Sequence, residues 1–319
     1  MREPIYLGID LGGTKIAAGL VTRAGELRSL ARVATPARQG VEAVVAAAWE
    51  VTKLAARGAQ VAVGRITGVG VGAPGPIDRT AGVVVAPPNL PGWKDVDLRS
   101  LMERRLRAPV HLENDANAAG LAEVRFGAGR GCSPVIYLTV STGIGGALLV
   151  DGRLITGAAG AAGEAGHLVV LPDGPSCGCG GRGCLEALAS GTAVARRARE
   201  AVRRGAASAL TERFGSRPGR ITARTVAKLA DQGDPEAQRI VTQAMEYLGI
   251  GVANLVNLIN PERVVIGGGL TALGPRMFDP VRRAVRRHCN PVAVRAVTIE
   301  PAALGADSGV IGAATLAMD

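Results

Sequence analysis

The sequence lacks the features that direct a chain into or across a membrane. Residues 1–5 contain no apolar signal region, and no apolar run approaches the length of a membrane-spanning helix. We therefore expect a cytoplasmic protein with no membrane partner. Low-complexity tracts are absent as well. With 319 residues, 47% of them hydrophobic, the chain is long enough for two globular domains with a large buried core.

Lysine is scarce, so the net charge of +10 rests almost entirely on arginine. The arginines are spread along segments of helical pattern, such as 196–204 and 282–287. Neither cluster lies in a recognisable nucleic-acid-binding motif. Solvated helix faces are therefore favoured over a groove for a polyanion, and we expect no nucleic-acid partner.

Cysteine is also sparse, and its odd count of five in a chain without a secretory peptide disfavours a disulfide framework. Three cysteines, Cys177, Cys179 and Cys184, lie in one glycine-rich stretch that follows His167. One imidazole and three thiolates form a complete tetrahedral set for Zn²⁺, and a set with no open position is typical of a structural site. The alternative is a loose glycine-rich turn with incidental cysteines.

Two carboxylates flank these four candidate ligands. Glu164 precedes His167, and Glu186 follows the last cysteine, so a metal that fixes the loop would also fix both acids. Paired carboxylates accept hydrogen bonds from adjacent hydroxyls, which indicates a sugar ligand. If one ring nitrogen of His167 binds the metal, its other N–H can donate to the same sugar.

The start of the chain predicts a hairpin with an anion-binding turn. Two β-rich apolar runs, 5–11 and 14–21, are separated by Gly12-Gly13. The glycines let backbone N–H groups approach an anion, Thr14 adds a hydroxyl, and Asp10 at the strand end could hold a hydrated Mg²⁺. A plain turn is the alternative. A P-loop is excluded, because no Gly-Lys-Ser/Thr follows at the required spacing.

The same pattern recurs further along the chain. A strand at 134–140 runs into a glycine-rich turn containing Thr142-Gly143 and doubles back to residue 150. Two such hairpins imply duplicated halves that close on one nucleotide. A third glycine-rich strand end, with Gly268 and Gly269, suits the flat face of a base or ribose. Close packing is an equal alternative for these glycines.

Further candidate residues follow other strands. A buried strand at 66–72 ends in a loop with Gly75, at the carboxyl end where α/β proteins place ligands. Asn89 lies in an exposed turn and either bonds a hydroxyl or caps that turn. Asn114 and Asp115 begin a helix after the short strand 110–112. They are either helix caps or, for Asp115, a base kept ionised by the helix N-terminus.

The remaining pattern alternates strands and helices. Helices are predicted at 41–57, 97–107, 191–204, 222–231, 235–259, 275–288 and 305–317, with further strands reaching 35 and at 263–266 and 297–300.

The motifs occur together in one order: Asp10-x-Gly-Gly-Thr-Lys15, Glu113-Asn-Asp-Ala-Asn117, the turn at 141–147, Glu164-x-Gly-His167 and the cysteine loop through Glu186. Together they resemble the ROK family (repressors, open reading frames, kinases), and within it the bacterial ATP-dependent glucokinases. The resemblance covers essentially the whole chain. It implies the actin-like ATPase (ribonuclease H-like) fold, a duplicated two-domain α/β sugar kinase with an interdomain cleft. The smaller domain would comprise 1–115 plus 304–319, and the larger 116–303 with the zinc loop.

The resemblance implies phosphorylation of glucose at its 6-hydroxyl by ATP and Mg²⁺, with Asp115 as general base and structural Zn²⁺ in the loop. It implies sugar contacts by Gly75, Asn89, Asn114, Asp115, Glu164, His167 and Glu186. Nucleotide and Mg²⁺ contacts would come from Asp10, Gly12, Gly13, Thr14, Lys15, Thr142, Gly143, Gly268 and Gly269. The zinc ligands would be His167, Cys177, Cys179 and Cys184.

Two departures from the family pattern occur at Ser141 and Ala147, where the family more often has glycine. Thr142-Gly143 is intact, so phosphate binding is still expected. The first strand begins by residue 5, so we expect no winged helix-turn-helix of the kind that family regulators carry. A homodimer or homotetramer is implied. The open alternatives are another hexose (N-acetylmannosamine, N-acetylglucosamine, fructose or mannose), polyphosphate as donor, and a non-catalytic sugar sensor.

Overall fold

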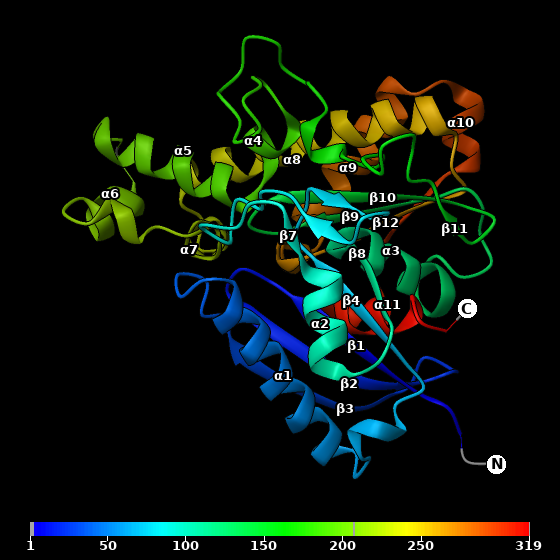
Figure 1. The fold of residues 1–319 in the computed structure, drawn as a ribbon. Helices are drawn as coiled ribbons and strands as arrows, with labels where there is room; N and C mark the ends of the chain where they lie inside the picture. Colours follow the sequence, from blue (N-terminus) through cyan, green and yellow to red (C-terminus); the bar gives the residue numbers. More distant parts are fainter. Residues whose placement is uncertain (1–2, 207, 319) are drawn as a thin grey trace. The chain divides into compact units, whose positions relative to one another are not determined.

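The N-terminal part of the chain forms a five-stranded mixed sheet in the order β3-β2-β1-β4-β8 (Figure 1). Its strands are β1 (Ile5–Leu11), β2 (Lys15–Thr22), β3 (Leu27–Ala34), β4 (Gly68–Ala73) and β8 (Val110–Asn114). β1 and β2 pair antiparallel, which confirms the predicted hairpin, whereas β4 pairs parallel with both β1 and β8. The computed structural model describes residues 3–206 and 208–318.

Alternation along β1 directs its side chains into two different cores. Leu7, Ile9 and Leu11 join the larger core, where the apolar side of α1 (Val41–Gly58) packs. Tyr6 joins the smaller core, together with Ile311 of α11 (Ser308–Thr315). Asp10 lies two positions after Gly8 in β1, so both residues are on the side of the sheet that faces α11.

Helix α11 lies directly on the sheet backbone. A Cβ on Gly70 would overlap the carbonyl oxygen of Ala313, and a Cβ on Gly8 would overlap that of Val310. Only glycine permits this approach, which brings the first turn of α11 next to the end of β1. On its other side α11 packs against α3 (Asp115–Phe126).

A second five-stranded sheet has the order β11-β10-β9-β12-β13. Its strands are β9 (Val135–Val140), β10 (Ile144–Val150), β11 (Arg153–Leu154), β12 (Arg263–Gly267) and β13 (Thr298–Pro301). β12 lies parallel to both β9 and β13. The β9–β10 connection is the predicted second hairpin, and β12 ends at the predicted third glycine-rich position.

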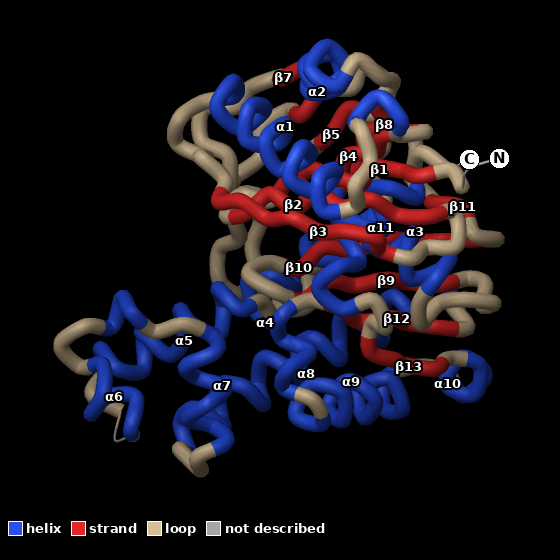
Figure 2. The backbone as a smooth tube through the Cα atoms, turned by 90° about the horizontal axis from the view of Figure 1, so that it is seen from below, coloured by secondary structure: helices blue, strands red, loops and turns tan. Residues whose placement is uncertain are grey.

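The long helix α8 (Pro235–Ile259) is the centre of a helical layer and contacts α4, α5, α7 and α9. Asp234 caps its N-terminus, and Asn260 ends it in the left-handed conformation. Figure 2 shows the helices of this layer as blue tubes. Their bounds are α4 Leu185–Ala189, α5 Gly191–Arg203, α6 Ala209–Phe214, α7 Ala223–Asp231, α9 Pro275–His288 and α10 Pro291–Ala296.

Most predicted elements are confirmed within a few residues. The last predicted helix begins instead as a 3₁₀ turn, η5 (Gly305–Asp307), before α11, and α2 spans Leu98–Leu106. The sequence patterns missed the helices α4, α6 and α10 and a three-stranded sheet of β5 (Ile77–Asp78), β6 (Val83–Val84) and β7 (Val96–Asp97). They also missed the short 3₁₀ helices η1 Val63–Arg65, η2 Ala165–His167, η3 Pro218–Arg220 and η4 Gly269–Leu273.

The contacts divide the chain into two units. The first comprises Met1–Cys132, Ala147–Gly163 and Ala302–Asp319, and the second Ser133–Gly146 and Glu164–Pro301. The domain limits inferred from the sequence, after residue 115 and before residue 304, stay a prediction. Among the described helices, none is both long and apolar enough to cross a membrane.

Candidate functional site

Hydrogen bonds fix the base of the turn between β1 and β2, whereas the residues at its tip are exposed. The N–H of Gly12 donates to the carbonyl of Lys15 at 3.0 Å, and the Thr35 hydroxyl donates to the carbonyl of Gly12 at 2.6 Å. Thr14 and Lys15 are exposed. A Cβ on Gly13 would lie 2.6 Å from that of Asn89, so two candidate segments meet here. The exposed turn suits an anion.

The surroundings of Asp10 disfavour the ionised form of its carboxyl group. Burial raises the pKa of its carboxyl above the ordinary value, and Lys15 and Arg32 offset part of that increase. A Cβ on Gly309, in the first turn of α11, would lie 2.8 Å from its Oδ2. A carboxylate kept in such a place is a candidate for binding a cation.

Two parallel strand ends meet at the candidate base. β4 and β8 are paired in register through Ala73 and Asn114. The Oδ1 of Asn114 accepts the N–H groups of Ala116 at 2.9 Å and Asn117 at 3.3 Å, so the cap interpretation is confirmed for Asn114. Its Nδ2 lies 3.1 Å from where a Cβ on Gly75 would be. Asn114 therefore presents its donor end toward the Gly75 loop.

Asp115 is the first residue of α3 and is half-buried. Its Oδ1 accepts the N–H of Ala116 at 2.8 Å. The partial positive charge of a helix N-terminus favours the ionised carboxylate at this position. The arrangement is consistent with both a cap and a base.

The second glycine-rich turn is fastened by α5 and by Glu186. The N–H of Thr192 donates to the Thr142 carbonyl at 3.2 Å and its hydroxyl at 2.8 Å, while the N–H of Gly191 donates to the Ser141 carbonyl at 2.7 Å. The Oε2 of Glu186 accepts the N–H of Ile144 at 2.8 Å. No sequence pattern indicates this last contact, which links a residue predicted to bind the sugar to a turn predicted to bind phosphate.

The third glycine-rich strand end has a structural reason. Gly268 has a φ of 90°, and a Cβ there would lie 2.5 Å from the carbonyl oxygen of Val140. Close packing therefore accounts for Gly268. Gly269 has more room, since its Cβ would lie 3.6 Å from the Ser141 hydroxyl oxygen. Contact with adenosine stays a prediction for both.

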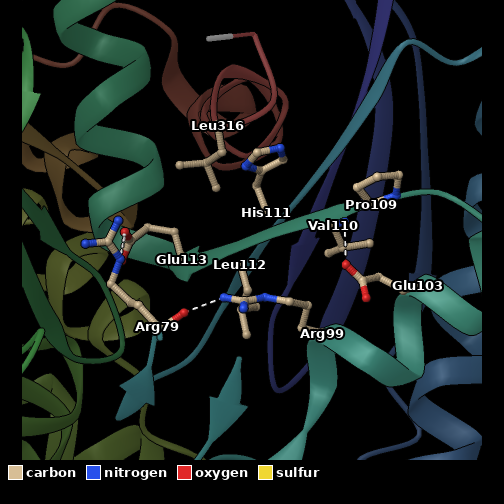
Figure 3. A pocket seen from close by; sticks show the side chains of 9 residues that line it. All are labelled: Arg79, Arg99, Glu103, Pro109, Val110, His111, Leu112, Glu113 and Leu316. Carbon is tan, nitrogen blue, oxygen red and sulfur yellow. Dashed lines mark hydrogen bonds and ion pairs between the residues drawn. The ribbon is translucent and has the colours of Figure 1, made fainter. Parts of the chain in front are cut away.

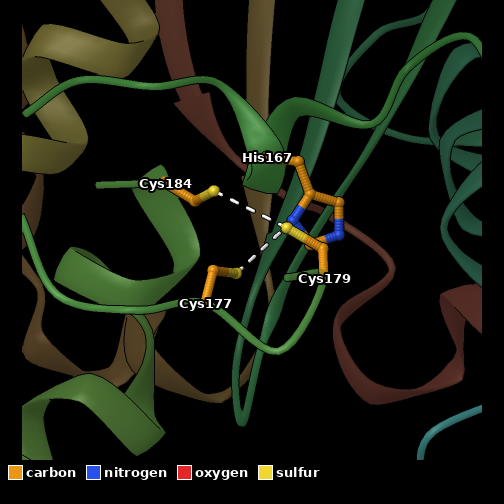
Figure 4. A group of neighbouring side chains, drawn as sticks. All are labelled: His167, Cys177, Cys179 and Cys184. Carbon is orange, nitrogen blue, oxygen red and sulfur yellow. Dashed lines mark hydrogen bonds between the residues drawn. The ribbon is translucent and has the colours of Figure 1, made fainter. Parts of the chain in front are cut away.

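His167 and the three cysteines of the loop converge (Figure 4), with all four ligand atoms within 4.8 Å of one another. The Sγ of Cys177 lies 3.7 Å from the Nδ1 of His167, and the Sγ atoms of Cys179 and Cys184 are 3.8 Å apart. Tetrahedral bonds of about 2.3 Å to sulfur and about 2.0 Å to nitrogen place neighbouring ligand atoms about 3.5–3.8 Å apart. The four side chains therefore fit a zinc ion.

The surroundings agree with this donor set. Burial, with contributions from the neighbouring thiols, raises the pKa of Cys184 to about 12, whereas hydrogen bonds from Gly181 and Cys177 lower that of Cys179. A coordinating divalent cation deprotonates such thiols outright. The Nε2 of His167 points away from the cluster and lies 4.0 Å from Oε2 of Glu164. A carboxylate near the second nitrogen is typical of metal-binding histidines.

The predicted sugar contacts divide between the two units. Gly75, Asn89, Asn114 and Asp115 belong to the first, and Glu164, His167 and Glu186 to the second. Within the first unit, the Gly75 loop reaches Asn114 and the Asn89 turn reaches Gly13. Within the second, Glu186 reaches the turn at Thr142-Gly143 through Ile144.

The fold and these clusters define a class of protein, the two-domain α/β sugar kinases. One structure of that class, a ROK family glucokinase from Streptomyces griseus in complex with glucose and AMPPNP, superposes with a TM-score of 0.84. It is 38% identical and the match covers 98% of this chain and 99% of that one.

The sequence pattern of the ROK family matches residues 6–319, so the chain belongs to the ROK family. A glucokinase from Thermotoga maritima is 39% identical over 97% of this chain and 96% of its own length. A xylose repressor from Caldicellulosiruptor bescii is 36% identical over 70% of this chain, which corresponds to 55% of the repressor.

The raised pKa of Asp10 predicts an unusual effect of Asp10→Asn on stability. A folded pKa above the unfolded value means that Asp10 favours folding only while protonated, and that this contribution is lost as pH rises through the folded pKa. The asparagine variant is therefore expected to unfold at a higher temperature than the wild type at pH 7. The advantage should shrink toward pH ~4, near the unfolded pKa.

Asp97→Asn is the matched control with the opposite sign. A backbone hydrogen bond from Ser100 lowers the pKa of Asp97, so its contribution is present at neutral pH and lost as pH falls. Thermal unfolding of both variants followed by circular dichroism at several pH values tests the pair. If the Asp10→Asn protein is less stable than the wild type at pH 7, the raised pKa of Asp10 is contradicted.

Proposed function

We propose that this chain is an ATP-dependent glucokinase, which transfers the γ-phosphoryl group of ATP to the 6-hydroxyl of glucose. The observation that carries the proposal is the full-length likeness to a ROK glucokinase structure that holds glucose and AMPPNP. The naming of the Thermotoga maritima relative as a glucokinase supports the same reaction.

Phosphoryl transfer requires little covalent work from the protein, so positioning and electrostatics supply most of the rate. Asp115 accepts the proton of the attacking sugar hydroxyl. Its place at the N-terminus of α3 supports this role, because the helix favours its ionised form and so keeps it a proton acceptor at neutral pH.

Each unit contributes donors and acceptors for the sugar. Asn114 offers its Nδ2, since its Oδ1 is used by the helix. Glu186 offers its Oε1, since its Oε2 holds Ile144. Glu164 and the Nε2 of His167 complete the polar set, with the loops at Gly75 and Asn89 bordering it. Asn114 and Glu186 thus each have one atom fixed by the protein and one proposed for the ligand.

Each glycine-rich turn offers groups for phosphate. In the first, these are the N–H of Gly13 and the exposed side chains of Thr14 and Lys15, while the N–H of Gly12 is already used by the Lys15 carbonyl and only shapes the turn. In the second, they come from Thr142 and Gly143. Asp10 would hold a hydrated Mg²⁺, which would help to neutralise the charge that develops on the phosphates. The adenosine lies toward Gly269.

Zn²⁺ bound by His167, Cys177, Cys179 and Cys184 supplies a structural crosslink rather than chemistry, because the set has no open position. The loop that it closes runs from His167 to Cys184, and Glu164 and Glu186 lie just outside its two ends. The proposed consequence is that the metal controls sugar affinity through these two acids.

The reaction is tested with a panel of donors and sugars in an assay of ADP release. We expect glucose with ATP to give the highest kcat/KM, above mannose, fructose, N-acetylglucosamine and N-acetylmannosamine, and above polyphosphate as donor. A preference for another hexose would correct the substrate and keep the chemistry. Sugar binding by calorimetry without any turnover would instead favour the sensor alternative, to which the xylose repressor likeness points.

Asp115→Asn tests the general base. The side chains are nearly isosteric, and the amide oxygen can still accept the N–H of Ala116, so α3 should begin as before. General base assistance is worth about 10²–10⁴ in rate, and kcat should fall by at least that factor while glucose affinity is kept. Asp97→Asn, at the N-terminus of α2, controls for the loss of a helix-terminal carboxylate. A near-normal kcat for Asp115→Asn rules the role out.

Cys179→Ser tests the zinc loop. Loss of one of four ligands is expected to release the metal and raise the KM for glucose about 10- to 100-fold, while the KM for ATP changes little. Zinc content by elemental analysis accompanies the kinetics. Cys289→Ser, outside the loop, is the control. A zinc-free Cys179→Ser protein with unaltered glucose affinity contradicts the proposal.

A further inference from the structure

The acid next to the candidate base has a buried and fully used carboxylate. Glu113 is 1% exposed. Its Oε1 accepts the N–H of Asn114 at 2.8 Å and the side-chain N–H of Asn117 at 3.0 Å. Its Oε2 lies 2.6 Å from the Nε of Arg79, an ion pair in which these two buried atoms do not form a hydrogen bond with each other. Both oxygens of Glu113 therefore face protein groups, and its effect must pass through its neighbours.

Arg79 comes from the loop segment that contains the Gly75 turn. It directly follows β5, which begins two residues after Gly75. The Arg79–Glu113 pair therefore ties this segment to the end of β8, where Asn114 and Asp115 begin α3. The contact between the Gly75 loop and the Nδ2 of Asn114 lies between the same two segments.

The pair borders a cavity of about 440 Å³ in the first unit (Figure 3). Arg99, Glu103, His111 and Leu316 also line it. The side chain of Arg79 is 38% exposed, whereas that of Glu113 is 2% exposed. Arg99 donates to the main-chain carbonyls of Thr80 and Arg79 and so holds the backbone of this segment. The side chain of Arg79 is only partly buried, and its ion pair with Glu113 fixes where it lies.

We propose that the Arg79–Glu113 ion pair is a positioning device for the sugar site, which sets the Gly75 loop against Asn114 and Asp115. The proposal rests on the function proposed above. A buried carboxylate without its cation is strongly unfavourable, so the charge of Glu113 keeps Arg79, and with it the loop, in one place. We assign neither residue a catalytic role: Glu113 is buried, and Arg79 acts on the site through its ion pair with Glu113.

The test compares Glu113→Gln, Arg79→Gln and the double variant with the wild type. Glutamine at 113 keeps an acceptor for Asn114 and Asn117 but loses the charge that holds Arg79. A misplacement of about 1 Å at a reacting group can cost about 10²-fold, so we expect kcat/KM for glucose to fall about that much. Most of the loss should appear in the KM for glucose, with the KM for ATP within about twofold of the wild type.

The double variant separates positioning from general structural damage. Arg79→Gln alone leaves Glu113 charged, buried and unpaired, and should be the most defective protein. Adding Glu113→Gln removes that charge and allows an amide pair, so kcat/KM should partly recover. Glu103→Gln is the control, since Glu103 lines the same cavity but accepts the N–H of Val110 at the other end of β8. It should retain wild-type kinetics.

Equal glucose KM in Glu113→Gln, Glu103→Gln and the wild type, with only thermal stability changed, would overturn the proposal. If Glu113→Gln does not fold, Arg79→Lys serves instead, because it keeps the charge but loses the guanidinium geometry. Its glucose KM should rise, and an unchanged value would again contradict the proposal. A wild-type protein inactive on every sugar would refute the kinase function itself, a distinct outcome visible in the same assay.

Discussion

Irregular backbone in this protein is held by acidic side chains that accept main-chain N–H groups. A buried N–H without a partner is costly, and loops cannot satisfy all of theirs internally. Glu113 accepts the N–H of Asn114, Glu186 that of Ile144, and Glu123 those of Ala128, Ala303 and Leu304. Asp234 does the same for Ala209 and Ala237. The candidate base and the second phosphate turn both depend on such an acceptor, because each begins where a regular strand ends.

Local patterns allowed much of the fold to be predicted. The first hairpin was recognisable because two apolar runs flank Gly12-Gly13, and the metal cluster because its four ligands have a characteristic spacing. Short elements were missed for a physical reason. Strands of two residues, such as β5 and β6, are too short to show alternation, and they are stabilised by pairing rather than by their own sequence. Their absence from the sequence-based picture hid the segment that contains Arg79.

Long-range contacts were the part of the candidate site that could not be predicted. Glu186 lies 42 positions from Ile144, and nothing in either segment indicates that they meet. Gly268 illustrates a second limit of the sequence patterns. A glycine beside a ligand and a glycine beside another strand look alike in sequence, and only the overlap with Val140 identifies close packing at this position. The sequence patterns single out the polar residues as candidates, but they do not indicate which of their atoms the protein itself uses.

That distinction between used and unused atoms separates the acids by role. Glu113 has both oxygens engaged and a cation beside it, so its charge is compensated within the protein, and its task is to hold neighbouring segments. At Asp10, the charges of Lys15 and Arg32 offset only part of the pKa increase that burial causes. A carboxyl group in such a place is a candidate for compensation by a bound cation, which the proposed hydrated Mg²⁺ would provide. Glu186 combines the two kinds of role under the proposed function. One of its oxygens holds Ile144 in the second glycine-rich turn, and the other would contact the sugar, so one side chain would serve both the sugar and the turn proposed to bind phosphate.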